Sequence, residues 1–194
     1  MIKKSFLFKI EMEINTSQIF FKEHEDFRPN LTPEQMFKLG IFGGSYFRPI
    51  HSDVTGEDYS DQWKEFDWAI KMVEENPDNI KLLASSKAYA SLNACKVLAG
   101  SSLIDWQKSG WIIEDDPYGW VQWYCRFYSG KRSNDDARQI KRWLNFTGPK
   151  GRFKNQLVNK LKAAKTSYND LSISPVIRQG LLQWAYALTP DDLK

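Results

Sequence analysis

The sequence predicts a mainly α-helical protein, a single compact domain of about seven short helices with a small N-terminal β element. Apolar residues recur at helical spacing in segments between residues 63 and 188, and capping residues precede several of these segments. A strand-like alternation is confined to residues 6–14. The chain of 194 residues has the length of one domain, and its 42% hydrophobic content is sufficient for a core.

The predicted β element occupies residues 1–22, and the predicted helical core occupies residues 31–188. Within the β element, apolar and mostly charged side chains alternate over residues 6–14, which is the pattern of a strand with one buried face. A single strand needs a partner for its backbone groups. The sequence SQIFF at residues 17–21 is a candidate for that second strand.

Helix boundaries in the core follow from capping residues, glycines and prolines. Thr32 caps a helix that begins at Pro33, Gln35 completes a capping box, and Gly40 ends the helix. The glycines and prolines between Gly40 and Asp61 predict an irregular segment. Further helices are expected over residues 63–76, 80–98, 102–110, 117–129, 134–146 and 150–165, and from Pro175 onward.

The charge distribution is the most informative feature of the composition. Residues 126–165 carry 12 basic and 2 acidic side chains, a net charge of +10, whereas residues 51–118 carry 6 basic and 13 acidic ones. A basic block with few acids indicates a polyanionic partner, because lysine and arginine contact phosphates without reading a base sequence. The alternative is that the two segments pack together and neutralise each other.

The helices of this basic block separate their apolar side chains from their basic ones. Spacings of three and four predict core stripes of Trp120, Trp123, Tyr124 and Phe127, then Ala137, Ile140, Trp143 and Leu144, then Phe153, Leu157, Leu161 and Ala164. The basic residues fall on other faces and in the turns, and Tyr128 lies off the first stripe, where its ring can stack on a base. The residues predicted to contact nucleic acid are Arg126, Tyr128, Lys131, Arg132, Arg138, Lys141, Arg142, Lys150, Arg152 and Lys154.

The segment from Gly40 to Asp61 is long for a connection in a compact domain, and long loops often carry function. Its candidate catalytic residues are Arg48, which can hold an anionic group, and His51 and Asp53, which can move protons. A cleft at Gly43 and Gly44 would then hold a phosphate-containing or nucleotide substrate. The alternative is a loop that simply folds over the core.

The shape of the basic surface distinguishes an enzyme from a simple nucleic-acid-binding protein. A concave pocket that joins residues 43–53 to Arg132 or Arg142 favours the enzyme, and a flat basic face favours simple binding. The turn LNFTGPKGRFKNQL resembles the glycine hairpin of helix-hairpin-helix DNA-binding motifs, which often read GxGPK, although Phe146 stands where the first glycine belongs. That resemblance implies phosphate contacts at the turn, and the alternative is an ordinary glycine stop.

Longer stretches carry a second resemblance. The sequences GIFGGSYFRPI and WVQWYCRFYSGKRSNDDARQIKRW, with GRF and SPVIRQ downstream, resemble an uncharacterised family of hypothetical proteins from algal, microbial and viral sources. This family shares the motifs GIFGGxYxRPI and QWYCRFYxGxRxxDDxRQIxRW, and the resemblance covers most of residues 36–188. It implies one genuine domain and transfers no activity and no catalytic residue.

The sequence therefore predicts a nucleic-acid-binding protein that acts mainly through phosphate contacts, in DNA replication, repair or processing. The alternatives are an enzyme that acts on a phosphate-containing or nucleotide substrate and a protein interaction module. His24 lies among carboxylates, but no zinc spacing or nucleotide fingerprint occurs, so we expect no metal and no cofactor. Two distant cysteines and the lack of a long apolar run predict an intracellular protein, cytoplasmic or nuclear, without a membrane partner. DNA is not distinguished from RNA, and the oligomeric state is open.

Overall fold

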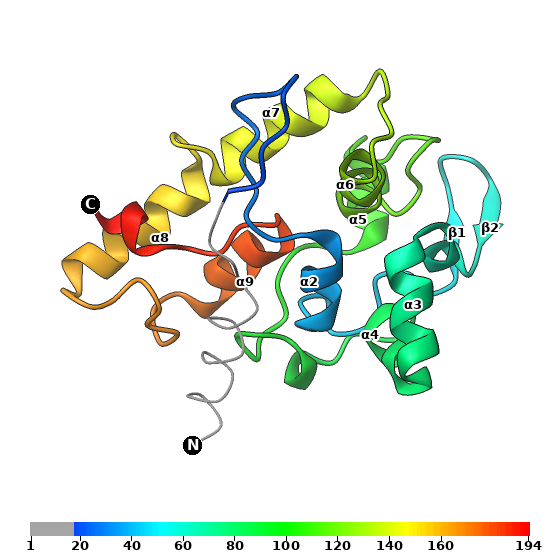
Figure 1. The fold of residues 1–194 in the computed structure, drawn as a ribbon, viewed down its shortest axis with the longest axis horizontal. Helices are drawn as coiled ribbons and strands as arrows, with labels where there is room; N and C mark the ends of the chain where they lie inside the picture. The colour runs from blue at the N-terminus through cyan, green and yellow to red at the C-terminus, as the bar shows by residue number, and fades with distance from the viewer. Residues whose placement is uncertain (1–17) are drawn as a thin grey trace.

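The computed structural model describes residues 18–194, and within them the chain is mainly α-helical, which confirms the predicted fold class (Figure 1). The α-helices are α2 (Pro33–Lys38), α3 (Asp67–Glu75), α4 (Ile80–Leu83), α5 (Leu103–Lys108), α6 (Trp120–Tyr128), α7 (Asp136–Thr147), α8 (Arg152–Ala163) and α9 (Pro175–Gln183). Short 3₁₀ turns lie at Gln62–Glu65, Pro77–Asn79, Ala90–Leu92 and Pro190–Leu193.

The β structure of the described residues is a hairpin in the segment predicted to be irregular. Strand β1 (Ile50–Ser52) pairs antiparallel with β2 (Glu57–Tyr59), so that His51 lies opposite Asp58. Gly56 in the turn has a φ of +73°, a conformation that glycine adopts at little cost. The hairpin projects at one edge of the molecule, beside α3 (Figure 1).

The strand predicted over residues 6–14 lies outside the described residues. Residues 18–21, the described part of the SQIFF segment, are not in a strand. The aromatic ring of Phe21 packs against Phe27 and Phe127, at ring-centre distances of 5.3 and 4.9 Å. The apolar character of the segment therefore serves contacts with α6 rather than pairing in a sheet.

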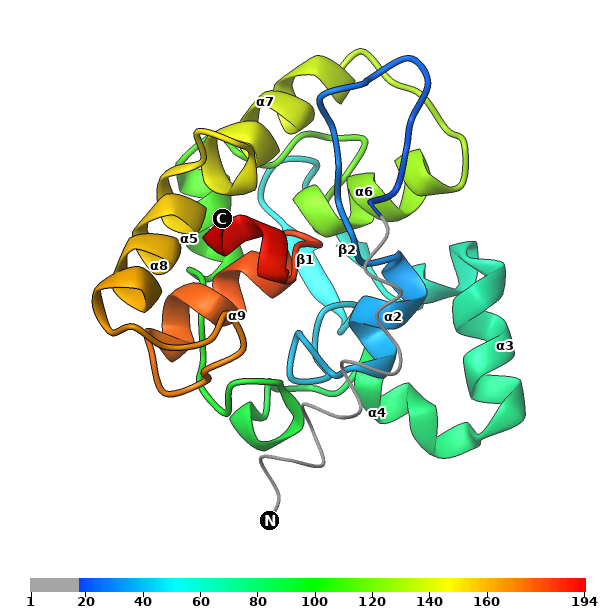
Figure 2. The same cartoon turned by 60° about the vertical axis from the view of Figure 1, so that its left-hand side comes forward.

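Helices α6, α7, α8 and α9 follow one another in space, with contacts between α6 and α7, α7 and α8, and α8 and α9. Helices α7 and α8 run along one side of the molecule, and α9 lies inside them (Figures 1 and 2). Phe27 is fully buried where the extended N-terminal segment crosses α6 and α7, and its ring contacts Trp123, Tyr124 and Trp143. An aromatic core thus holds the two halves of the chain together.

Local capping chemistry explains several helix ends. The Thr32 hydroxyl accepts a hydrogen bond from the Gln35 backbone N–H, and the Gln35 side chain accepts one from the Thr32 N–H, which confirms the predicted capping box. Ser102 and Asp105 form the same arrangement at the start of α5. A helix also begins at Pro175, as predicted.

Several predicted helices have the wrong extent; for example, the helix predicted over residues 63–76 is a 3₁₀ turn at Gln62–Glu65 followed by α3. Helix α6 begins at Trp120 rather than at residue 117, because Gly119 before it has a φ of +82° and a ψ of −150°. The helix predicted over residues 80–98 is regular only in α4, Ile80–Leu83, and continues as an irregular segment with one 3₁₀ turn. Backbone hydrogen bonds from Ser85 and Tyr89 to the carbonyls of Gly44 and Gly43 replace those of a continuous helix.

The aromatic stripe of α6 is buried as predicted, but the buried face of α7 is partly polar. Ala137 is exposed, whereas Asp136 is buried and accepts a hydrogen bond from the Trp123 indole N–H at 2.8 Å. Ala164 is also exposed, because α8 ends at Ala163. The helical period placed the aromatic rings correctly. It could not show that the Asp136 carboxylate would accept a hydrogen bond from a buried indole.

None of the helices within residues 18–194 combines the length and the apolar character that a bilayer-spanning helix requires.

Candidate ligand-binding cavity

A cavity of about 1060 Å³ lies among α5, α7, α8 and α9, beside the loop that follows α2. The segment between α4 and α5 forms one wall, the start of α6 forms the floor, and α7, α8 and α9 form the opposite wall. Figure 2 shows how α7, α8 and α9 come together on this side of the molecule, with α5 behind them. Segments far apart in the sequence therefore build one concave site.

The charge of this cavity is positive. Arg48, Lys87, Arg142 and Arg152 line it, and among the described residues no aspartate, glutamate or histidine does. Neutral polar groups complete the surface with hydroxyl and amide functions, and these belong to Ser45, Ser86, Ser101, Ser102, Asn145 and Gln183. The cavity is therefore suited to an anion that also carries hydrogen-bonding groups.

Arg142 is held between two tryptophans. Its guanidinium carbon lies 5.3 Å from the centre of the Trp111 ring and 5.4 Å from that of Trp184. One of its terminal nitrogens donates a hydrogen bond of 2.9 Å to the Gln139 side-chain oxygen. Burial and then the charge of Arg138 lower the pKa of Arg142, but an arginine stays charged in proteins. The charge is thus fixed in place at the cavity wall.

A row of stacked aromatic rings continues from that point. The ring centres of Phe153 and Phe146 are 4.3 Å apart, and those of Phe146 and Trp184 are 5.1 Å apart with planes inclined by only 18°. Trp184 in turn lies 4.6 Å from Trp120, and all four rings line the cavity. These rings give the cavity an apolar, aromatic lining.

The Arg48 end of the cavity is fixed by buried phenols. The Tyr46 hydroxyl donates a 2.6 Å hydrogen bond to the Tyr118 carbonyl and accepts one from the Gln122 N–H. The Tyr118 hydroxyl donates a hydrogen bond of 2.7 Å to the Arg48 carbonyl. Burial raises the pKa of Tyr118 to about 12 and also raises that of Tyr46, so both phenols are neutral at physiological pH.

Gly43 and Gly44 support the cavity without facing it. Gly44 has a φ of +90°, and a Cβ atom there would lie 2.1 Å from the Lys81 carbonyl oxygen. The two glycines pass directly beside residues 81–89 and accept the hydrogen bonds of Ser85 and Tyr89. They position the wall residues 86–88, while the predicted cleft itself is formed by neighbouring residues of the same loop.

The three candidate catalytic residues are not brought together. Arg48 lines the cavity and donates a hydrogen bond to the Ser45 carbonyl. The His51 side chain is 57% exposed on β1, with its Nδ1 atom 2.8 Å from the Asp58 carboxylate across the hairpin. His51 and Asp53 are exposed and are not among the described lining residues, so their proton-transfer roles stay predictions without a shared site.

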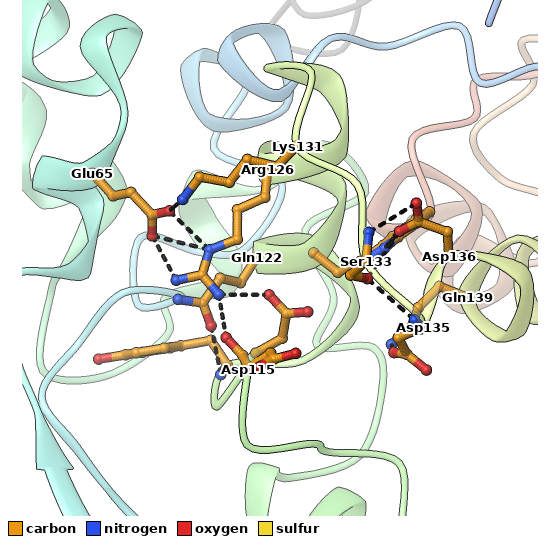
Figure 3. Close-up of polar contacts among 12 residues, drawn as sticks. Glu65, Asp115, Gln122, Arg126, Lys131, Ser133, Asp135, Asp136 and Gln139 are labelled. Atoms are coloured by element: carbon orange, nitrogen blue, oxygen red, sulfur yellow. Dashed lines mark hydrogen bonds and ion pairs between the residues drawn. The ribbon is translucent and has the colours of Figure 1, made fainter. Parts of the chain in front are cut away.

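The predicted nucleic-acid-binding residues divide into groups. Arg142 and Arg152 line the cavity. Five others lie in ion pairs, namely Arg126 with Glu65 and Asp116, Lys131 with Glu65, Arg132 with Glu23, Arg138 with Asp135, and Lys154 with Asp192. Figure 3 shows the Glu65 carboxylate paired with both Arg126 and Lys131. Since Glu65 and Asp116 belong to the acidic segment, that segment neutralises part of the basic block.

Arg132 and the three remaining members of the predicted set lie on the surface. Arg132 lies over the Phe127 ring, 4.0 Å from its centre, and is 3.4 Å from the Glu23 carboxylate. The Tyr128 ring is 40% exposed at the end of α6. Lys141 and Lys150 are exposed, and within residues 18–194 neither has an acidic partner. The continuous basic face that the sequence suggested is thus reduced to separate positions.

The cavity also contains residues that sequence reasoning missed. Trp106, Trp111, Lys87 and Trp184 lie on different segments, and no spacing along the chain relates them. Trp184 is at apolar helical spacing from Ile177 and Leu181 in the sequence, and α9 ends one residue before it. The exposure of Trp111, at 43%, is a property of the folded chain. No local sequence pattern could therefore predict that these residues line the same cavity.

The turn between α7 and α8 joins two helices, and its glycines are used for close packing, so the phosphate contacts that the resemblance implied stay a prediction. A Cβ atom at Gly151 would lie 2.6 Å from the Thr147 backbone nitrogen, and one at Gly148 would lie 2.7 Å from the Leu144 carbonyl oxygen. Gly148 and Gly151 are buried and have negative φ angles. Their role in the structure is to let the two helices turn tightly.

The described part of the chain contains neither a reactive cysteine nor a cluster of metal ligands. Cys95 and Cys125 are free thiols. Burial raises the pKa of Cys95 to about 11 and raises that of Cys125 as well, which keeps both protonated. Within residues 18–194, no group of three or more histidine, cysteine or acidic side chains is arranged to hold a metal ion.

Asp116 gives a testable pH dependence. Burial raises its pKa to about 6, although the Arg126 guanidinium lies 2.8 Å away. A carboxyl group whose folded pKa exceeds its unfolded value of about 3.9 binds its proton first in the folded state. Its stabilising contribution is therefore complete below about pH 4 and is lost as the pH rises through 6. Relative to Asp116→Asn, we expect wild type to gain about 2 kcal/mol when the pH falls from 7 to 4.5.

Urea unfolding of both proteins at the two pH values measures this difference. Glu65, whose pKa is lowered by hydrogen bonds from Arg126 and Lys131 against the effect of burial, is present in both proteins, so much of its opposite contribution cancels. A difference in unfolding free energy that is independent of pH would show that Asp116 stays ionised throughout.

Comparison with protein-family models gives no match, and comparisons with curated proteins and with solved structures give no significant match. The fold and the site together define a mainly α-helical protein with a cationic, aromatic cavity. The resemblance to an uncharacterised family therefore stays a prediction, and function is argued from the cavity itself.

Proposed function

We propose that the protein binds a nucleotide in the cavity. The observation that carries this proposal is the composition of the cavity wall: four basic side chains, a row of aromatic rings and, among the described lining residues, no acid. The basic groups suit a phosphate, and the rings suit a planar base. The serine hydroxyls with Asn145 and Gln183 suit the sugar and the base edges.

Two further observations support this choice. The cavity joins Ser45, Tyr46 and Arg48 to Arg142, which is the concave arrangement that favours a ligand cleft over a flat binding face. Its volume of about 1060 Å³ lies just above the range of about 300–1,000 Å³ that small-molecule sites occupy. The proposal concerns binding, because the described wall contains no carboxylate or imidazole placed for proton transfer.

Titration with deoxyadenosine monophosphate, followed by calorimetry or by the fluorescence of the cavity tryptophans, tests the proposal. Deoxyadenosine and inorganic phosphate are titrated separately, and each is expected to bind more weakly than the nucleotide that combines them. In Arg142→Ala we expect the affinity to fall about tenfold to hundredfold, because a charge-assisted hydrogen bond to phosphate is lost.

Lys162→Ala is the matched control, since it removes one positive charge from α8 at an exposed position that is not among the described lining residues. Its nucleotide affinity should equal that of wild type. Equal losses in Lys162→Ala and Arg142→Ala would indicate a non-specific charge effect. Absence of binding by wild type at millimolar nucleotide would overturn the proposal.

A further inference from the structure

We propose that the nucleotide belongs to a single-stranded nucleic acid, whose neighbouring phosphates lie along the exposed side of α7 and α8. This inference rests on the proposed function, because it names the macromolecule that supplies the nucleotide. It follows from where the cavity opens, from the charges beside the opening and from the aromatic surface inside.

Lining residues of the cavity reach the surface in several places, and these include the α7–α8 turn and the first turn of α9. Val176 and Trp111 line the cavity and yet are 54% and 43% exposed. Asn145 on α7 and Arg152, the first residue of α8, also line the cavity and are exposed. A chain with one unit inside the cavity can therefore leave it along the surface where the two helices meet.

That surface carries basic groups without neutralising partners. Lys141 lies one turn before Asn145, so the two side chains share a face of α7. Lys150 lies in the turn, two residues before Arg152. Within residues 18–194, neither Lys141 nor Lys150 has an acidic partner, in contrast to Arg138 and Lys154 on the same helices. These free charges are placed to contact phosphates that flank a bound nucleotide.

The cavity interior favours unpaired bases. A positively charged groove combined with aromatic side chains is the arrangement by which proteins bind single strands, since each base can stack on a ring. Phe153, Phe146 and Trp184 give the cavity an aromatic lining, and Trp111 and Trp184 lie 5.3 and 5.4 Å from the Arg142 guanidinium carbon. Bases in a duplex are already stacked and paired, and they would have to leave the duplex to enter.

Fluorescence anisotropy of labelled deoxyadenylate and adenylate strands of about ten nucleotides tests the inference, because single-strand sites span about 4–16 nucleotides. The deoxyadenylate strand paired with its complement is the duplex control, and deoxyadenosine monophosphate is titrated in parallel. We expect at least one of the strands to bind more than about tenfold more tightly than the mononucleotide, and more tightly than the duplex. The affinity for the strand should also fall with rising salt.

Three variants test whether the strand contacts the residues named above. Lys141→Ala and Lys150→Ala should each weaken strand binding more than mononucleotide binding, and each should reduce the slope of log affinity against log salt by about 0.7 for a lost phosphate contact. Trp111→Ala should weaken strand binding about fivefold to hundredfold through lost stacking.

The outcomes separate the inference from the proposed function. If the mononucleotide binds but neither strand binds more tightly, or if the duplex binds as tightly as the strand, the inference is overturned and the nucleotide site stands. The same holds if both lysine variants bind the strand like wild type. If the mononucleotide does not bind at low salt and millimolar concentration, the proposed function itself fails, and the inference that rests on it fails too, whether or not a strand binds.

Discussion

Replacing Trp143 with alanine is expected to lower the free energy of unfolding by about 3–5 kcal/mol. Trp143 is 1% exposed, and its ring contacts Phe27 at a ring-centre distance of 5.1 Å. Its indole N–H donates a 2.8 Å hydrogen bond to the Trp184 carbonyl, which ties α7 to the end of α9. The substitution therefore leaves both a large cavity and an unpaired carbonyl group. Urea unfolding followed by circular dichroism measures the loss.

Two further variants make this measurement specific. Trp143→Phe retains most of the buried ring and removes the indole N–H, so we expect a loss of about 1–3 kcal/mol. Trp111→Ala removes a tryptophan that is 43% exposed, and its unfolding free energy should change by less than about 1 kcal/mol. Similar losses in Trp111→Ala and Trp143→Ala would contradict the distinction between a cavity tryptophan and a core tryptophan.

Replacing Gly44 with alanine should be similarly destabilising, by about 3–5 kcal/mol. The φ of +90° is strained for any residue with a Cβ atom, and that atom would overlap the Lys81 carbonyl oxygen at 2.1 Å. To accommodate it, residues 81–89 must move away from the glycine loop. Because Ser86, Lys87 and Ala88 belong to the cavity wall, the variant should also bind nucleotide more weakly. Thermal or urea unfolding and the nucleotide titration give the two readouts.

Gly56→Ala is the matched control for this effect. Gly56 also has a positive φ, of +73°, but among the described residues nothing lies within 4 Å of a Cβ atom placed there. We expect only the conformational cost of about 1–2 kcal/mol, with nucleotide affinity unchanged. If Gly44→Ala and Gly56→Ala lose equal stability, the close approach of the glycine loop to residues 81–89 does not limit substitution.

The candidate site was partly accessible to sequence reasoning. Arg142 and Arg152 were selected for their positive charge, and Arg48 was selected as an anion-holding group in a long loop; all three line the cavity. Arg126 was selected by the same charge criterion, yet it is bound by Glu65 and Asp116. Charge counted along the chain cannot distinguish these cases, because Glu65 and Arg126 are 61 residues apart.

The fold was more accessible where it depends on neighbouring residues. The capping box of Thr32 and Gln35 and the aromatic stripe of α6 are relations between residues three or four apart, and the structure confirms both. The helix predicted over residues 80–98 was wrong beyond Leu83, because the carbonyls of Gly43 and Gly44 bind the backbone there. A distant loop thus overrides local helix propensity.

By itself, the sequence determined that this protein is mainly α-helical, where several helices begin and end, and that the tryptophans of α6 lie in the core. Those properties depend on backbone capping and on a period of 3.6 residues, which are local. Only the tertiary structure decided which cations are free and that Trp111, Trp184 and Arg142 face one cavity. These properties depend on contacts between distant segments, because burial and ion pairing are set by the fold as a whole.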